Sequence, residues 1–434
     1  MTFVDKRDTV CVVGAGASGI TAIKNLMELD IPVEGIEREA AVGGNWIYGA
    51  RFSSVYASAH LISSKPLTEY TDFPFPDDYP DYPSHNQVLA YLRRYAEHFG
   101  VTDRIRFKSE VRWVSRSEED GCWDVELDDG STHRYRALII ANGHHWDPKY
   151  PPYAGQFAGQ EIHAADYKTP DILRGRRVLV IGGGNSGCDI AVDAAHNAAV
   201  TYHSTRRGYW YIPKYVMGQP VDQVGERFLK MGLPLGVRRA LSTLMIRIVL
   251  GHPTRFGLPE PDHKLLESHP IVNSQVYYHI GHGDIIPKPD VAVMSHDGAR
   301  FIDGTVARVD VVIYATGYNI RVPFIDKRDL NWKEPGPRLW LHIFHPRTEN
   351  LFMVGLIQPD GGQFGLVDWQ CRLIARYLKA AEEAPAKAEA FRAKVNGPQP
   401  DIRGGRKLDT DRHLLEVEHF SYRKTLMQLA EELA

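Results

Sequence analysis

The stretch that decides the fold is Val10-Cys11-Val12-Val13-Gly14-Ala15-Gly16-Ala17-Ser18-Gly19, a short apolar run that ends in glycines spaced G-x-G-x-x-G. An amphipathic segment follows it, and a second apolar run over 33–36 ends at Glu37. This order predicts a strand, a tight turn, a helix and a parallel strand, with the unpaired N–H groups of the helix N-terminus facing a pyrophosphate. The beginning of the chain is therefore expected to bind a dinucleotide.

The same pattern recurs later in the chain. The apolar run 178–181 leads into Gly182-Gly183-Gly184-Asn185-Ser186-Gly187, then into a helical stretch and a further apolar run over 200–203. Two more apolar strands, 137–140 and 309–314, end in small-residue turns before and after this second fingerprint. The sequence thus predicts an α/β protein with two Rossmann-like dinucleotide-binding domains, the second inserted into the first.

The residues that end the two second strands separate the two ligands. Glu37 places a carboxylate where it accepts hydrogen bonds from ribose hydroxyls and repels a 2′-phosphate, which suits FAD or NAD. Arg206, preceded by Ser204 and Thr205, places a guanidinium where it can pair with a 2′-phosphate. The second fingerprint is therefore expected to bind NADPH.

Composition narrows the class of protein. The 434 residues include 51 Lys plus Arg and 54 Asp plus Glu, so the formal net charge is −3, unlike that of a strongly basic nucleic-acid binder. The four cysteines are too far apart for a disulfide framework or a C-x-x-C site, and the histidines lack partners at metal-ligand spacing. There is no apolar run of about 18 residues. We expect a cytoplasmic protein without a metal site, transmembrane segment or nucleic-acid partner.

Four motifs carry a resemblance to a known family. Residues Phe157 to Tyr167 fit the pattern F-x-G-x-x-x-H-x-x-x-Y, and the chain also contains Gly43-Gly44-Asn45-Trp46, Asp72-Phe73-Pro74-Phe75-Pro76 and Ala315-Thr316-Gly317-Tyr318. Over nearly its whole length the sequence resembles the flavin-containing monooxygenases, which depend on FAD and NADPH. The related Baeyer–Villiger enzymes normally have Trp where this chain has Tyr167, so the motif favours the first group.

The resemblance implies a reaction cycle. NADPH reduces FAD, the reduced flavin takes up oxygen as a C4a-hydroperoxide, and a soft nitrogen or sulfur nucleophile of a small-molecule substrate attacks the distal oxygen. The protein must exclude water so that the peroxide does not collapse to hydrogen peroxide. A homodimer is also implied by the resemblance.

The expected domain boundaries follow from the motifs. An FAD-binding domain is expected from two parts, 1–166 and 290–434, the second of which ends in a helical tail. The inserted NADPH-binding domain is expected over 167–289, and its irregular portion is expected to contact the substrate. There, Trp210, Tyr211, Tyr277 and Tyr278 are candidates to line an apolar pocket. Residues Val237, Leu241, Leu244, Ile248 and Val249 share one face of a predicted helix, which we expect to pack on the core.

Candidate cofactor-binding residues come from the fingerprints and from the resemblance. Asn45 and Trp46 match a flavin-contacting pair, and a late loop that ends at Gln363 resembles the family's closing loop over the flavin. On the flavin side the candidates are Gly14, Ala15, Gly16, Ser18, Gly19, Glu37, Gly44, Asn45, Trp46, Leu61, Ile62 and Gln363. On the NADPH side they are Gly182, Gly184, Asn185, Ser186, Gly187, Cys188, Asp189, Ser204, Thr205 and Arg206.

One position departs from the family pattern. The family usually has an Asn three residues before the Lys of the loop His60-Leu61-Ile62-Ser63-Ser64-Lys65, where its amide supports the nicotinamide and the flavin peroxide. Here that position is Ile62, whose side chain cannot donate a hydrogen bond. The catalytic candidates are therefore His60, Ser63 and Ser64, with His60 first because an imidazole N–H can reach a flavin or nicotinamide oxygen.

Several alternatives stay open at this point. A Baeyer–Villiger ketone monooxygenase would use the same cofactors. Ile62 also leaves room for an uncoupled NADPH oxidase or for a nucleotide-sensing flavoprotein without turnover. A disulfide reductase fits poorly, because no two cysteines lie within ten residues of each other.

Overall fold

The first of two large sheets is built around the first glycine fingerprint. The computed structural model describes residues 2–267, 270–404 and 414–434. Strand β1 lies between β2 and β6 and pairs in parallel with both. The C-terminal strand β22 also pairs with β6, and β4 and β5 extend the sheet as antiparallel hairpins. The bounds are β1 Phe3–Val13, β2 Val33–Ile36, β3 Ile105–Arg106, β4 Val111–Arg116, β5 Trp123–Leu127, β6 Thr132–Ile140 and β22 Leu351–Met353.

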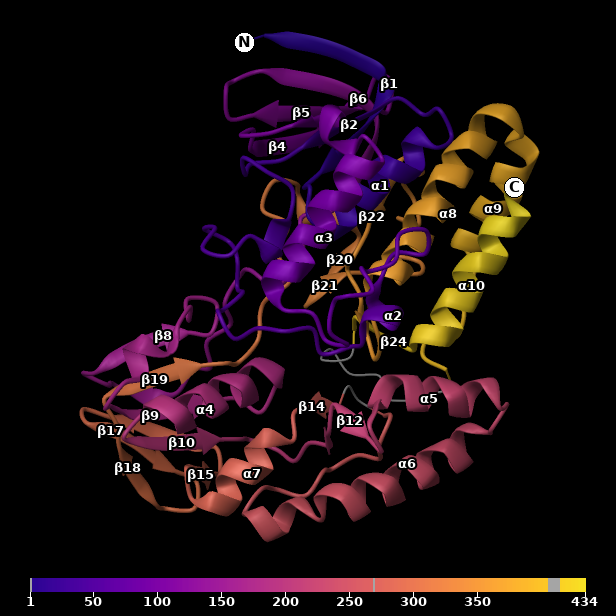
Figure 1. The fold of residues 1–434 in the computed structure, drawn as a ribbon. Coiled ribbons are helices and arrows are strands. Elements are labelled where there is room, and N and C mark those ends of the chain that lie inside the picture. Colours follow the sequence, from indigo (N-terminus) through magenta and orange to yellow (C-terminus); the bar gives the residue numbers. More distant parts are fainter. Residues whose placement is uncertain (1, 268–269, 405–413) are drawn as a thin grey trace.

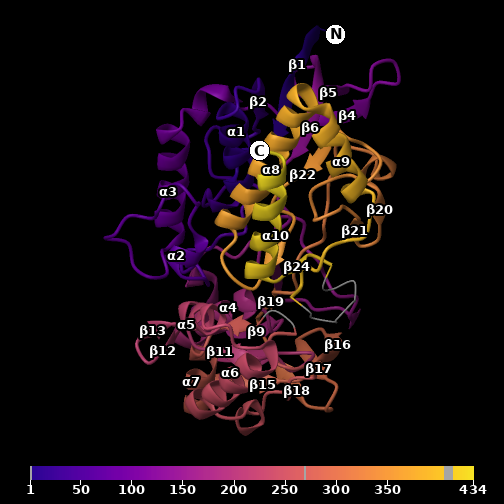
Figure 2. The same cartoon turned by 90° about the vertical axis from the view of Figure 1, so that its right-hand side faces the viewer.

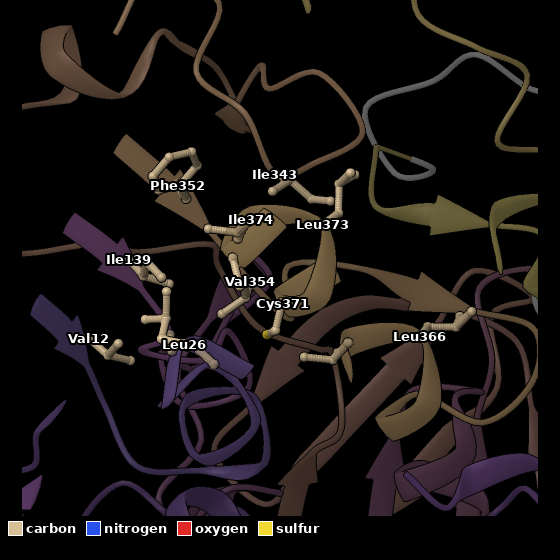
Figure 3. Close-up of a cluster of buried hydrophobic side chains, with 14 of the residues drawn as sticks. Val12, Leu26, Ile139, Ile343, Phe352, Val354, Leu366, Cys371, Leu373 and Ile374 are labelled. Atoms are coloured by element: carbon tan, nitrogen blue, oxygen red, sulfur yellow. The ribbon is translucent and has the colours of Figure 1, made fainter. Parts of the chain in front are cut away.

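Helices from both ends of the chain cover this sheet. Figure 1 shows α1 and α3 beside the C-terminal helices α8, α9 and α10 in the upper part of the molecule. Side chains of β1, α1, β6, β22 and α8 share one buried cluster, of which Val12, Leu26, Ile139, Phe352 and Ile374 are part (Figure 3). The bounds are α1 Ala17–Met27, α2 Lys65–Thr68, α3 His85–His98, α8 Phe364–Glu383, α9 Pro385–Val395 and α10 His419–Glu432.

The second sheet is built around the second fingerprint and forms the lower part of the molecule in Figure 1. Its five parallel strands run in the order β15-β10-β9-β19-β8, and helix α4 follows β9. A smaller sheet, β18-β17-β16-β7, lies beside it. The bounds are β7 Ala154–Gly155, β8 Gln160–His163, β9 Arg177–Ile181, α4 Asn185–Asn197, β10 Val200–Ser204, β15 Ile285–Lys288, β16 Val291–Ser295, β17 Gly298–Phe301, β18 Val306–Arg308 and β19 Val311–Tyr314.

The expected α/β architecture with two dinucleotide-binding folds is confirmed, but the expected boundaries fall inside the second unit. Strand β8 precedes position 167 and β19 follows position 289, and both pair within the second sheet. The hydrogen-bonded unit therefore runs from β7 to β19. Residues 405–413 of the expected C-terminal tail lie outside the described residues.

The remaining elements connect or cap the two units. Figure 2 shows α5, α6 and α7 on the lower unit, beneath the C-terminal helices of the upper one. None of the helices in the described ranges is both long enough and apolar enough to cross a membrane. The bounds are β11 Tyr211–Ile212, β12 Tyr215–Val216, β13 Gln219–Pro220, α5 Val221–Lys230, α6 Leu235–Leu250, β14 Ile271–Val272, α7 Gln275–His282, β20 Trp332–Lys333, β21 Gly336–Pro337, β23 Gln358–Pro359 and β24 Glu416–Val417.

Helix α6 corrects one expectation. It forms where its apolar periodicity predicts it, but the face that was expected to pack on the core is exposed. A neighbouring side of the helix lines a cavity instead, through Arg238, Ser242, Met245 and Ile246. The exposed residues are Val237, Leu241, Leu244, Ile248 and Val249, whose exposed fractions range from 42% to 74%.

Candidate active site

The turn between β1 and α1 forms one wall of a cavity of about 270 Å³. Gly14 has φ +105°, and a Cβ there would lie 2.7 Å from the carbonyl oxygen of Ala141. A Cβ on Gly19 would lie 1.8 Å from the carbonyl oxygen of Gly14, so these two glycines are required by the fold itself. Gly16 is different: its backbone is ordinary extended chain, and the nearest atom to a Cβ there is the Cα of Gly44 at 3.4 Å.

Glu37 lines the same cavity from the end of β2. The carboxylate is buried and accepts hydrogen bonds from the backbone N–H groups of Ala15, at 2.6 Å, and Glu39, at 2.8 Å. These contacts fix the carboxylate beside the glycine turn. The arrangement fits the expected role of Glu37 as an acceptor for ribose hydroxyls at this end of the strand.

Another part of the lining of this cavity comes from the C-terminal part of the chain. The loop before α8 lies against the first fingerprint so closely that a Cβ on Gly355 would meet the hydroxyl of Ser18 at 2.1 Å. Gln363 holds the loop in shape by donating from Nε2 to the carbonyl oxygen of Gly355, at 3.1 Å. Helix α8 begins at the next residue, Phe364, so its N-terminus, with the positive end of the helix dipole, faces the cavity.

In the second fingerprint, too, the outer glycines are required by close packing and the middle one is not. Gly182 has φ +126°, and a Cβ there would lie 2.2 Å from the carbonyl oxygen of Ala315, while one on Gly187 would lie 2.0 Å from the carbonyl oxygen of Gly182. Around Gly184, by contrast, a Cβ would meet no heavy atom within 4 Å among the described residues. In both fingerprints, then, the middle glycine is the one of the three spaced glycines at which a Cβ would make no contact shorter than 3.4 Å among the described residues. This is where a pyrophosphate would approach the backbone.

A larger cavity of about 590 Å³ is lined by the second fingerprint and shares part of its lining with the smaller cavity. Asn45 and Trp46 line both cavities, while Gly184, Asn185, Ser186 and Asp189 line the larger one from the second domain. The Asn45 side-chain oxygen accepts from the backbone N–H and the hydroxyl of Ser54, at 2.8 and 3.0 Å. Apolar side chains of β11, α5, α6 and residues 265–272 line another part of it; they include Ile212, Val221, Val224, Phe228, Ile246, Leu265 and Val272.

The three catalytic candidates occupy different positions. His60, Leu61, Ile62 and Ser63 line the larger cavity, whereas Ser64 is fully buried and lies outside its lining. The hydroxyl of Ser63 shares a hydrogen bond of 2.7 Å with that of Thr68. We therefore drop Ser64 from the catalytic set and retain His60 and Ser63.

A polar cluster in the larger cavity was not foreseen from the sequence. The Asp189 carboxylate accepts from the hydroxyl of Tyr56 and from the side-chain amide of Asn273, both at 2.8 Å. Burial raises the pKa of Asp189. Tyr56 and Asn273 come from segments distant in the chain, so no local pattern could have grouped them with Asp189. Through this cluster, α4 contacts the loop 53–60 of the first domain.

The prediction that four aromatic residues line the pocket is wrong. Among the described residues, Trp210, Tyr211, Tyr277 and Tyr278 do not line the larger cavity. Tyr211 and Tyr277 are buried in a separate cluster with Cys188, and Tyr278 is 60% exposed. Tyr211 and Tyr277 fill the contact between α4 and α7, because these two helices turn their apolar faces toward each other rather than toward the cavity.

Comparison with known proteins decides the family. A family described as flavin-binding monooxygenase-like matches residues 6–429. The chain belongs to this family. It is 31% identical over 451 residues to flavin-containing monooxygenase 5 from Rattus norvegicus, across 98% of this chain and 83% of that protein.

Two solved structures show the same fold as this monooxygenase. The S-allyl-L-cysteine S-oxygenase from Allium sativum superposes with a TM-score of 0.67 at 21% identity, covering 99% of this chain and 90% of the other. Cyclohexanone monooxygenase in its open form gives a TM-score of 0.74 at 19% identity, covering 100% and 98%. At identities this low, the likeness to the two structures shows a shared fold alone.

The cofactors of the monooxygenase are FAD and NADPH. The residues of the two glycine turns fit these groups, because each turn leaves a space that a single Cβ would enter. Gly14, Gly16, Ser18, Glu37, Gly44 and Gln363 line the smaller cavity, which we assign to FAD. Cys188 is fully buried with its thiol directed at the carbonyl oxygen of Gly183, so its role is packing of α4.

Arg207, which follows the predicted Arg206, is a further candidate to bind the 2′-phosphate of NADPH. The Ser204 hydroxyl is already engaged with the carbonyl oxygen of Pro289, at 2.7 Å, and Arg206 is exposed. Arg207 is half-buried, and its Nε and Nη2 atoms have no acceptor within the described ranges. The buried hydroxyl of Thr205 likewise has none. Unpaired buried donors of this kind indicate an anionic ligand.

Arg206→Ala and Arg207→Ala are each expected to raise the Michaelis constant for NADPH by about ten- to a hundredfold, the equivalent of about 1.5 to 3 kcal/mol for a charge-assisted hydrogen bond. The constant for NADH should change little, because NADH lacks the 2′-phosphate. Steady-state kinetics with both nucleotides measure this. Arg174→Ala, at an exposed position of the same domain, is the matched control. Equal effects on NADPH and NADH would contradict the assignment.

Proposed function

We propose that this protein is an NADPH-dependent flavoprotein monooxygenase that inserts one oxygen atom of O2 into a soft nitrogen or sulfur nucleophile of a small molecule. The observation that carries the proposal is the larger cavity, because it is lined at once by residues next to both glycine turns and by the apolar side chains of α5 and α6. A lipophilic amine or sulfide would fit such a lining.

The flavin, when bound and reduced, supplies the activation of oxygen, and the protein supplies binding, orientation and the exclusion of water. Glu37 and the N-terminus of α8 both line the smaller cavity. Trp46 contributes apolar surface to both cavities, and Ile62 contributes it to the larger one. Support for sulfur as the acceptor atom comes from the Allium sativum S-oxygenase, whose fold this chain shares.

Product analysis under isotopically labelled O2 tests the proposal. Methyl phenyl sulfide, N,N-dimethylaniline and cyclohexanone are offered separately with NADPH, and products, hydrogen peroxide and NADPH consumption are measured. We expect a sulfoxide or an N-oxide that carries one labelled oxygen for each NADPH consumed. A lactone from the ketone with neither of those products would overturn the proposal in favour of Baeyer–Villiger oxygenation. Peroxide equal to NADPH with every probe would indicate an oxidase, and bound FAD without NADPH consumption would indicate a sensing protein.

His60 is proposed to take over part of the role that the family assigns to the missing Asn. Its Nδ1 lies 2.9 Å from the carbonyl oxygen of Ser58, and since a carbonyl only accepts, Nδ1 carries a proton there. In the neutral imidazole the other ring nitrogen, Nε2, then carries no proton. Toward the cavity that His60 lines it can accept a hydrogen bond, for example from the carboxamide N–H of a nicotinamide, but it cannot donate the N–H expected from the sequence. Ser63 offers a hydroxyl on the same loop, already shared with Thr68.

His60→Ala is expected to raise the hydrogen peroxide released per NADPH by about five- to tenfold, the factor that corresponds to the loss of one hydrogen bond of about 1 to 1.4 kcal/mol. Bound flavin should stay at the wild-type level, since His60 lies outside the lining of the smaller cavity. A peroxide assay beside NADPH absorbance measures the ratio. Ser63→Ala is run in parallel: unchanged coupling in His60→Ala with lost coupling in Ser63→Ala would transfer the role to Ser63.

Two coarser properties complete the proposal. The homodimer implied by the family resemblance is tested by light scattering after size-exclusion chromatography. A cytoplasmic location is supported by the four free cysteines, three of which are buried. Fractionation of cells that express the protein tests that location.

A further inference from the structure

The loop that carries Ile62 contacts its own domain at both ends and through Thr68, whose hydroxyl bonds to the Ser63 hydroxyl and to the carbonyl oxygen of Ser64. The backbone N–H of Leu61 donates to the carbonyl oxygen of Pro83, at 3.0 Å, and that of Lys65 donates to the carbonyl oxygen of Asp81, at 2.8 Å. These two bonds fix the outer ends of the segment 61–65. They leave the carbonyl of Leu61 and the N–H of Ser64, which directly flank Ile62 and Ser63, to find partners elsewhere.

Both of these partners come from the segment inserted with the second domain. The Lys214 ammonium donates to the carbonyl oxygen of Leu61, at 3.3 Å, and the Asp222 carboxylate accepts from the backbone N–H of Ser64, at 2.6 Å. Ser64 is fully buried, so its N–H has no water to replace Asp222. One cation and one anion of the inserted segment therefore bracket Ile62 and Ser63.

Lys214 and Asp222 are themselves anchored. The backbone carbonyl of Lys214 accepts from the Tyr82 hydroxyl, at 2.6 Å, and from the N–H of Val221, at 3.0 Å. Asp222 lies in the first turn of α5, where its other carboxylate oxygen accepts from the N–H of Gln223, at 2.9 Å. Hydrogen bonds thus run from the loop 61–65 to Asp222, from Val221 to Lys214, and from Lys214 back to the loop, so the start of α5 and the loop are held together.

We propose that Lys214 and Asp222 are positioning residues that hold the Ile62–Ser63 loop in the shape required for coupled oxygenation. The inference rests on the proposed function. Asp222 also lines the larger cavity together with Val221 and Val224, so a molecule in the cavity contacts α5 while α5 holds the loop. In this arrangement, filling the cavity stabilises the loop that protects the flavin from wasteful peroxide release.

The test uses the full-length, flavin-loaded protein and four variants. Asp222→Ala removes the acceptor, whereas Asp222→Asn keeps an oxygen that can accept from Ser64 and loses only the bond from the N–H of Gln223. Lys214→Met removes the donor and keeps the length of the side chain. Lys230→Ala is the matched control, because Lys230 lies on α5, is 70% exposed and pairs only with Glu226 among the ion pairs of the described residues. The readouts are amide hydrogen exchange over 60–66, flavin content and peroxide released per NADPH.

We expect the Ser64 amide to exchange about tenfold faster in Asp222→Ala, which corresponds to about 1.4 kcal/mol of local stability. Lys214→Met should also speed exchange over the loop, and both variants should release severalfold more peroxide at unchanged flavin content. Asp222→Asn and Lys230→Ala should behave like wild type. Rescue by Asn would distinguish a hydrogen bond that positions the loop from a general effect of the charge.

Each other outcome has a definite meaning. Unchanged exchange of the Ser64 amide in Asp222→Ala would show that Asp222 does not hold the loop. Faster exchange with unchanged coupling would overturn the positioning role. Were the wild-type protein to release peroxide for every NADPH with all probes, the proposed function would fail, and the exchange data would still decide whether Lys214 and Asp222 hold the loop.

Discussion

Replacing Gly16 by valine is expected to give a folded protein that is purified without bound flavin. Gly16 has an extended backbone that valine adopts readily, and its Cβ would meet only ordinary contacts, at 3.4 Å or more. The added methyl groups enter the space that the FAD pyrophosphate requires, and overpacking of this kind costs about 1 to 3 kcal/mol or more, which is about ten- to a hundredfold in affinity. The ratio of flavin to protein absorbance measures the loss.

The control for this variant lies outside both glycine turns. A Cβ on Gly236 would meet no heavy atom within 4 Å among the described residues, so Gly236→Val introduces the same side chain at a position that lines neither cavity. It should keep its flavin. A yellow, fully loaded Gly16→Val protein would contradict the placement of the pyrophosphate, and loss of the folded state in circular dichroism would contradict the argument that Gly16 is free of the fold.

Gly184→Val is expected to separate the two cofactors. Gly184 has the same extended backbone as Gly16 and open space around its Cα, so the protein should fold and bind FAD as wild type does. Reduction of the flavin by NADPH should be slowed by about ten- to a hundredfold at low nucleotide concentration, because the valine occupies the position of the nucleotide pyrophosphate. Stopped-flow absorbance of the flavin under anaerobic conditions gives the rate as a function of NADPH concentration.

The flavin itself provides the internal control for this second variant. Photochemical or dithionite reduction should proceed as in wild type, since neither uses the nucleotide site. A Gly184→Val protein that NADPH reduces at the wild-type rate and with the wild-type dependence on concentration would remove the second fingerprint from the reaction. Loss of flavin instead of loss of reduction would show that the two turns had been assigned to the wrong cofactors.

Local sequence patterns predicted most of what surrounds the cofactors. The runs before Gly14 and Gly182 form β1 and β9, and the helices after them form α1 and α4. Each of these elements is encoded by neighbours in the chain, through apolar periodicity and through glycines that only a tight turn requires. A strand, turn and helix encoded in this way form without depending on which other elements pack against them.

What could not be predicted depends on which face of an element meets which other element. The apolar stripe of α6 gave its helical form correctly but could not say that Ile246 would turn inward while Ile248 is 74% exposed. The aromatic residues near Tyr211 had the right character for a pocket, yet they pack against Cys188. Likewise, the contact of Asp222 with Ser64 joins positions 158 apart, and no spacing rule connects them.

The route of the chain through its two domains sets an order of completion during synthesis. All strands of the second sheet and of its smaller neighbour lie between Ala154 and Tyr314, so that unit has its whole hydrogen-bonding pattern as soon as this contiguous stretch has emerged. The first sheet must wait for β22, and its buried cluster must wait for α8 and α10. In a nascent chain the second dinucleotide fold is therefore complete while the first sheet still lacks β22. The N-terminal strand and helix become fully buried only after α8 and α10 have been synthesised.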